Sequence, residues 1–160
     1  MTATFKRLLN AVAAGLCGSL AHTALMAFKN WAGILPAFTP YDDLQAALTR
    51  MAGTSVPPLV VWALTYFNGS VVLSFLFGRL VRYLPAESGA GKGAVFGLGV
   101  WLAMGVAFFP AIGKGLFAAQ TSLGFAPTAF SLAMVLTYSV TLGVTYAVFT
   151  AEPRAKPDVR

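Results

Sequence analysis

One apolar stretch, residues 89–110, constrains the fold more than any other part of the chain. Glycine costs a helix in water about 1 kcal/mol per residue relative to alanine, yet in lipid a helix face without side chains lets a second helix approach closely. In this stretch every fourth residue is glycine or, once, tryptophan, so all five positions share one helix face: Gly89, Gly93, Gly97, Trp101 and Gly105. We therefore predict a membrane-spanning helix at the packing centre of a bundle.

The composition and the length of the other apolar stretches predict a membrane protein. Hydrophobic residues make up 58% of the 160 residues and charged residues only 10%, which is outside the range of soluble domains. We predict an all-α membrane protein, a four-transmembrane-helix bundle that forms one domain over residues 1–151. Residues 152–160 are polar and rich in proline, and are predicted to be a disordered cytoplasmic tail. The four spans are expected at about residues 8–28, 57–78, 90–110 and 128–150.

A short amphipathic helix is predicted in the first outer loop. Thr39 supplies a hydroxyl cap, Pro40 suits the first helical position, and Asp42 and Asp43 add negative charge at the start of the helix, which Gly53 ends. The sequence leaves open whether this helix lies on the lipid interface or covers the bundle. Its apolar face consists of Tyr41, Leu44, Leu48 and Met51.

The first and fourth spans also carry small residues at helical spacing. They are Gly15 and Ser19 in the first span, and Ser139, Gly143 and Ala147 in the fourth. With the glycines of the third span, they are the residues we expect at helix-to-helix contacts.

The distribution of Lys and Arg predicts the orientation. With four spans, eight basic residues fall on the side of the termini and three on the other side. We therefore expect a protein of the bacterial inner membrane with both termini in the cytoplasm. The eight are Lys6, Arg7, Arg79, Arg82, Lys92, Arg154, Lys156 and Arg160, and the three are Lys29, Arg50 and Lys114.

His22, the only histidine, lies roughly two-thirds of the way through the first span and is the one candidate for chemistry. It could carry a proton, ligate haem or contact a substrate. Alternatively, a neutral imidazole is hydrogen-bonded to Asn68 or to a helix carbonyl, and this structural interpretation is favoured. A candidate polar seam comprises His22, Tyr66, Asn68, Ser70, Thr137, Tyr138 and Thr141, although interhelical hydrogen bonds explain the same residues.

Several functions are disfavoured by residue chemistry. No carboxylate lies inside a predicted span, which argues against proton-coupled multidrug exporters. Residues 86–93 approach a phosphate-binding loop, but Gly93 stands where a hydroxyl should hold magnesium, so no nucleotide is expected. The basic residues occur in ones and twos, so no nucleic acid is expected either. No catalytic residue, metal site or cofactor is predicted, and whether the protein is an enzyme stays open.

The third span and the loop after it carry a longer pattern. Residues 93–117 read GxxFGxxxWLxMxxxFFPxxGxGLF, and the final span has Tyr138 and Leu142-Gly143 near its middle. In this the chain resembles small four-span bacterial inner-membrane proteins of unknown function. The resemblance implies a helical bundle and supplies no catalytic residue.

Three functional hypotheses follow from these observations. The leading one is a non-catalytic subunit or assembly partner of a membrane complex, because the distinguishing residues form packing surfaces. The alternatives are a small oligomeric transporter or channel for a neutral or apolar solute, and a haem- or quinone-linked redox subunit that uses His22. The expected partners are the lipid bilayer and either further copies of the chain or other membrane subunits.

Overall fold

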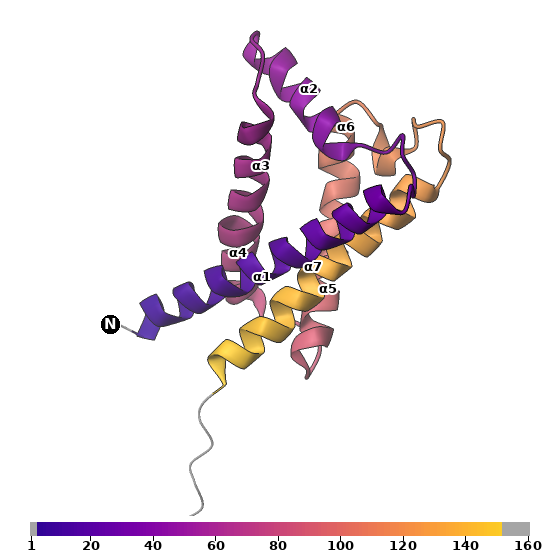
Figure 1. The fold of residues 1–160 in the computed structure, drawn as a ribbon. Coiled ribbons are helices and arrows are strands. Elements are labelled where there is room, and N and C mark those ends of the chain that lie inside the picture. Colours follow the sequence, from indigo (N-terminus) through magenta and orange to yellow (C-terminus); the bar gives the residue numbers. More distant parts are fainter. Residues whose placement is uncertain (1–2, 152–160) are drawn as a thin grey trace, which may run out of the picture.

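The computed structural model describes residues 3–151, and all regular structure in this range is helical (Figure 1). Four helices are long and apolar enough to cross a membrane, and their ends lie within about three residues of the predicted ones. The predicted four-span fold is therefore confirmed, while the predicted disordered tail, residues 152–160, lies outside the described residues. The spans run over Phe5–Trp31, Pro58–Leu80, Gly89–Ala111 and Ala126–Thr150.

The second and third spans each contain a π-helical turn, which the sequence patterns do not predict. The second span consists of α3 (Pro58–Phe67), η1 (Asn68–Leu73) and α4 (Ser74–Leu80). The third consists of α5 (Gly89–Ala103), η2 (Met104–Phe108) and α6 (Phe109–Ala111). The remaining elements are α1 (Ala3–Trp31), α2 (Pro40–Ala52), the 3-10 turn η3 (Leu116–Ala118) and α7 (Ala126–Thr150).

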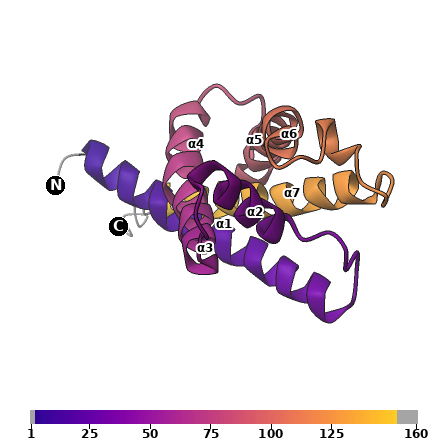
Figure 2. The same ribbon diagram turned by 90° about the horizontal axis from the view of Figure 1, so that it is seen from above.

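Two long helices, α1 and α7, run antiparallel and side by side through the centre of the molecule (Figures 1 and 2). The second span packs on α1 through η1 and α4, and the third packs on α7 through α5. Because the spans alternate in direction, the start of α1, the α4–α5 turn and the end of α7 lie at one end, here called the terminal end. The opposite end carries α2 and η3 and is called the α2 end.

Small residues lie where these helices come closest. An added Cβ at Gly89 would stand 2.6 Å from the Gly143 carbonyl oxygen, and one at Gly93 would meet the carbonyl oxygen of Ser139. Between α1 and the second span, a Cβ at Gly15 would lie 2.7 Å from that of Ser74. Contacts this short leave no room for a side chain. On the other face of α5, Gly99 has nothing within 4 Å.

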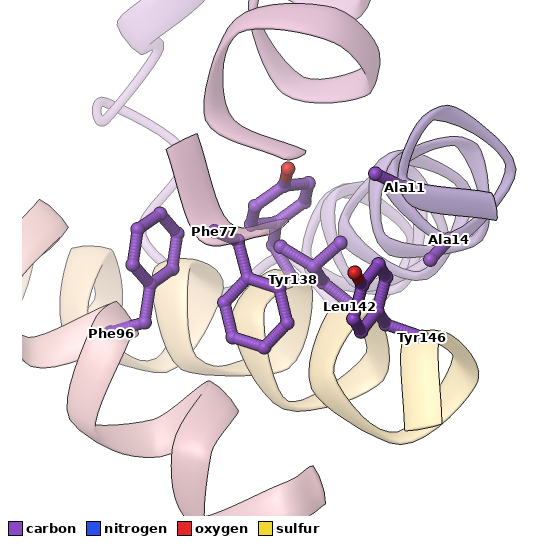
Figure 3. Packing of buried hydrophobic residues seen from close by; sticks show 7 residues of the cluster. All are labelled: Ala11, Ala14, Phe77, Phe96, Tyr138, Leu142 and Tyr146. Atoms are coloured by element: carbon purple, nitrogen blue, oxygen red, sulfur yellow. The ribbon is translucent and has the colours of Figure 1, made fainter. Parts of the chain in front are cut away.

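Aromatic side chains fill the terminal half of the core (Figure 3). Phe77 of α4 is fully buried, and its ring centre lies 5.3 Å from that of Phe96 on α5 and 5.6 Å from that of Tyr146 on α7. One ring thus connects three spans. The cluster comprises Ala11, Ala14, Phe77, Phe96, Tyr138, Leu142 and Tyr146.

The amphipathic helix α2 covers the end of the bundle, which decides the alternative that the sequence left open. Ala47 is buried, and Tyr41 and Leu44 pack on a buried cluster that includes Met26 of α1 and Phe109 of α6. The helix stops at Gly53, which adopts the left-handed conformation (φ 67°) that glycine tolerates best. Met51 does not belong to this packed face, because its side chain is exposed.

The predicted hydroxyl cap of α2 is wrong. Thr39 precedes the helix, but its side chain makes no capping hydrogen bond. The start of the helix is instead held by Pro40 at the first position and by Asp43, which forms an ion pair with Lys114 of the α6–α7 loop at 2.9 Å. This ion pair ties the first turn of α2 to that loop, and the Asp43 charge is favourable near the helix N-terminus.

Candidate functional site

His22 on α1 is hydrogen-bonded to the covering helix α2. Its Nε2 lies 2.9 Å from the hydroxyl of Tyr41, and the backbone of Met134 on α7 is the other polar neighbour of the ring. The predicted partner Asn68 is not involved, since its side chain is exposed. Burial, with a smaller contribution from Tyr66, raises the pKa of Tyr41 to about 12. The Tyr41 hydroxyl therefore keeps its proton and can donate to the imidazole.

A second hydrogen bond next to His22 connects α1 to the second span. The Thr23 and Tyr66 hydroxyl oxygens are 2.7 Å apart. Trp62 stacks on Tyr41, with ring centres 4.8 Å apart, and lies 6.2 Å from the ring of Tyr66. These residues form what we call the aromatic–polar cluster: His22, Thr23, Tyr41, Trp62 and Tyr66.

Deeper in the bundle, the π-helical turn η1 meets α1 and α7. The Tyr138 hydroxyl donates to the Gly69 carbonyl at 2.5 Å, and the Ser19 and Ser70 hydroxyl oxygens are 3.4 Å apart. A Cβ at Gly18 would lie 2.9 Å from the Tyr138 ring, so the glycine leaves space for that ring. The three elements are therefore joined by polar contacts at this depth.

The predicted polar seam is divided by the structure. Two of its residues, His22 and Tyr66, belong to the aromatic–polar cluster. Two others, Ser70 and Tyr138, make the deeper contacts around η1. Thr137 and Thr141 are half-buried on α7, and within residues 3–151 their hydroxyls make no side-chain hydrogen bond. Asn68 is exposed and belongs to neither set of contacts.

The third-span stripe of Gly89, Gly93, Gly97, Trp101 and Gly105 packs against α7 and η3. Trp101 donates its indole N–H to the Ser131 hydroxyl at 3.1 Å, and the ring of Phe117 fills the space beside Gly105. Ser139, Gly143 and Ala147 lie against Gly89, Gly93 and Gly97. In the part of the chain that the structure describes, the Ser139 hydroxyl is the buried side-chain polar group without a hydrogen-bond partner.

Lys29, a loop charge by its place in the sequence, is a buried cation. Its side chain is only 1% exposed, and Nζ donates to the Phe38 carbonyl at 2.8 Å and to Asn30 Oδ1 at 3.4 Å. The lysine thus joins the last turn of α1 to the chain that leads into α2. No sequence pattern predicted this contact, because it depends on how the loop folds back.

An apolar surface groove of about 530 Å³ lies between α5 and the start of α7. It is lined by Trp101, Leu102, Phe117, Ala119, Gly124, Phe125 and Thr128. Residues 3–151 contain no group of three or more His, Cys, Asp or Glu side chains that could hold a metal ion. None of the side chains lining the groove can act as an acid, a base or a nucleophile at neutral pH, except weakly the Thr128 hydroxyl, which donates to the Phe117 carbonyl.

Four spanning helices with interior polar groups bonded largely to one another define a multi-pass membrane protein of the helical-bundle class. The chain belongs to a family of unknown function (DUF6789), whose model matches residues 5–156. This confirms the resemblance to proteins of unknown function. No curated protein and no solved structure matches the chain.

Proposed function

We propose that this protein is a non-catalytic subunit or assembly partner of a membrane complex. The observation that supports this role is the use of the interior polar side chains. The imidazole of His22 and the hydroxyls of Thr23 and Tyr138, which a catalytic or transport site would use, are each engaged in a hydrogen bond within the chain. Such bonds stabilise helix association by about 0.6–2 kcal/mol each.

The close contacts of small residues support the same role. We propose that glycine and serine at four-residue spacing stabilise the association of α5 with α7 and of α1 with the second span by allowing close backbone approach. A protein whose distinguishing residues serve helix packing is suited to hold other helices in place.

A transport role is the second candidate, because one observation favours it. The groove beside Trp101 is apolar and, at about 530 Å³, lies within the size range of small-molecule sites. It would suit an apolar solute in an oligomeric carrier. A haem- or quinone-linked role for His22 would require the imidazole to leave Tyr41 or the Met134 backbone, and no contact in residues 3–151 favours that.

A tagged chain purified in mild detergent is expected to retain another membrane protein at a fixed ratio. The variants His22→Ala and Tyr41→Phe each remove the same hydrogen bond, so both are expected to lower the free energy of unfolding by about 0.6–2 kcal/mol and to retain that partner. Thermal midpoints and co-purified ratios measure the two effects.

Three results would contradict the proposed role. A cellular phenotype lost in His22→Ala but kept in Tyr41→Phe, at equal thermal midpoints, would make the imidazole a working group. A haem absorption spectrum would favour the redox alternative. A lone homo-oligomer that binds apolar solutes would favour transport.

We also propose that the chain resides in the bacterial inner membrane with both termini in the cytoplasm. The few basic residues at the α2 end support this orientation. Of these three, Lys29 is buried and Lys114 is paired with Asp43, which leaves Arg50 as the exposed cation without a described carboxylate partner. The positive-inside rule counts Lys and Arg residues, and eight against three favours the terminal end as the cytoplasmic one.

A reporter that is active only in the periplasm is expected to be inactive when fused after Arg160 and active when inserted after Gly115. The physical reason is the excess of Lys and Arg at the terminal end. A fusion after Ala86, in the α4–α5 turn, is the control and should be inactive. The opposite pattern would contradict the proposed orientation.

A further inference from the structure

Asn68 lies almost at the midpoint of the second span, Pro58–Leu80, which has 23 residues. At a rise of about 1.5 Å per residue, it is roughly 15 Å from either end of the span, close to the centre of the hydrocarbon layer. It is the first residue of the π-helical turn η1. The next two residues, Gly69 and Ser70, are buried against the bundle, whereas the Asn68 side chain is exposed.

The surface around Asn68 is apolar and faces away from the rest of the chain. One turn before it and one turn after it are Leu64 and Val72, both exposed, and Phe67 beside it is exposed as well. Within residues 3–151, no hydrogen-bond partner meets the Asn68 carboxamide. A polar group with two donors and one acceptor oxygen is thus directed towards the surroundings of the bundle.

An asparagine at this depth needs a partner in the membrane. Hydrocarbon offers no hydrogen bond, and transferring an amide from water to such a medium is strongly unfavourable. The side chain is too short to reach the interface, unlike that of lysine or arginine. Polar residues inside a membrane therefore usually face the bundle interior or pair across helices.

We propose that the surface of the second span around Asn68 is the contact between two copies of this chain. A carboxamide is self-complementary, because its N–H can donate to the oxygen of a second carboxamide while its own oxygen accepts in return. Two copies inserted in the same direction and related by a two-fold axis along the membrane normal hold Asn68 at equal depth. A second copy brings the matching carboxamide to that depth by symmetry, whereas a different protein would have to supply a polar group of its own there.

The position of the second span leaves this surface free for a second copy. Only 22% of its most apolar window is buried within the chain, the same share as in the third span, so the exposed carboxamide of Asn68 is what distinguishes this surface. On the bundle side, η1 and α4 pack mainly on α1 and α3 contacts α2, while Phe77 and Gly69 also reach the third and fourth spans. The inference goes beyond the proposed role, since a dimer could act alone or within a larger complex.

Cysteine cross-linking in native membranes tests the contact. In a Cys17→Ser background, Leu64→Cys places a thiol one turn from Asn68, on the proposed contact. It is expected to give a covalent homodimer with a short bifunctional reagent. Leu102→Cys, an exposed position near the middle of the third span, is the matched control and is expected to stay monomeric.

Substitution of Asn68 tests its part in the contact. Asn68→Ala is expected to raise the dimer dissociation constant in detergent about tenfold, as measured by sedimentation equilibrium, because two reciprocal hydrogen bonds are lost. Asn68→Gln keeps the carboxamide and is expected to restore part of the affinity. Asn10→Ala makes the same chemical change where the amide already donates to the Phe149 carbonyl, and should leave the dissociation constant unchanged.

The proposal fails if Asn68→Ala dimerises as well as the unmodified chain, or if Leu64→Cys cross-links no better than Leu102→Cys. It also fails if Leu64→Cys cross-links to a different protein in place of a second copy. An unchanged thermal midpoint of monomeric Asn68→Ala would show that the subunit itself remains folded. Co-purification of another subunit with that monomer would show that the proposed role in a complex does not depend on the dimer.

Discussion

Gly93→Leu is expected to lower the free energy of unfolding of the bundle by about 3 kcal/mol, at the upper end of the usual range for overpacking. At this position α5 and α7 are in backbone contact, and even a Cβ would overlap the Ser139 carbonyl group. Backbone atoms cannot rotate away as the end of a flexible side chain can. The two helices must therefore separate along their length, and the thermal midpoint in detergent should fall accordingly.

Gly99→Leu is the matched control on the opposite face of α5. No heavy atom lies within 4 Å of an added Cβ there, and leucine has a better helix propensity than glycine by somewhat less than about 1 kcal/mol. We expect the thermal midpoint of this variant to be unchanged or slightly higher. Equal destabilisation by the two substitutions would contradict the assignment of the Gly93 face as the contact with α7.

Phe77→Ala is expected to cost about 3 kcal/mol, because it empties the position where α4, α5 and α7 meet. The Phe77 ring is in edge contact with Phe96 and with Tyr146, and it is fully buried (Figure 3). In a bilayer the loss is mainly of packing contacts, since lipid is as apolar as the core. Unfolding followed by the fluorescence of the native tryptophans measures the change.

Phe75→Ala removes the same ring from the same helix at an exposed position. We expect it to cost less than about 1 kcal/mol, because lipid replaces the lost contacts. Equal losses in both variants would contradict the three-span contact at Phe77 as the source of the effect, because alanine has a better helix propensity than phenylalanine and propensity alone would not destabilise either variant.

The location of His22 shows how far the sequence could predict the candidate site. Its depth in the first span followed from residue count, and a hydrogen-bonded neutral imidazole was the favoured interpretation. Its partner could not be predicted, because Tyr41 reaches it only when α2 folds over the end of the bundle. Asn68, the partner expected from sequence, faces outward instead, because the π-helical turn buries Gly69 and Ser70 against the bundle.

By itself, the sequence determined the features whose free energy depends on neighbouring residues alone. The four spans followed from the length of apolar stretches relative to the bilayer, and the start and stop of α2 from Pro40 and Gly53. Only the tertiary structure decided which surfaces meet. The burial of Lys29, the contact of Gly93 with Ser139 and the outward direction of Asn68 each depend on the summed packing of distant helices. No local pattern encodes that sum, because each contributing contact is weak and its partner lies far away in the chain.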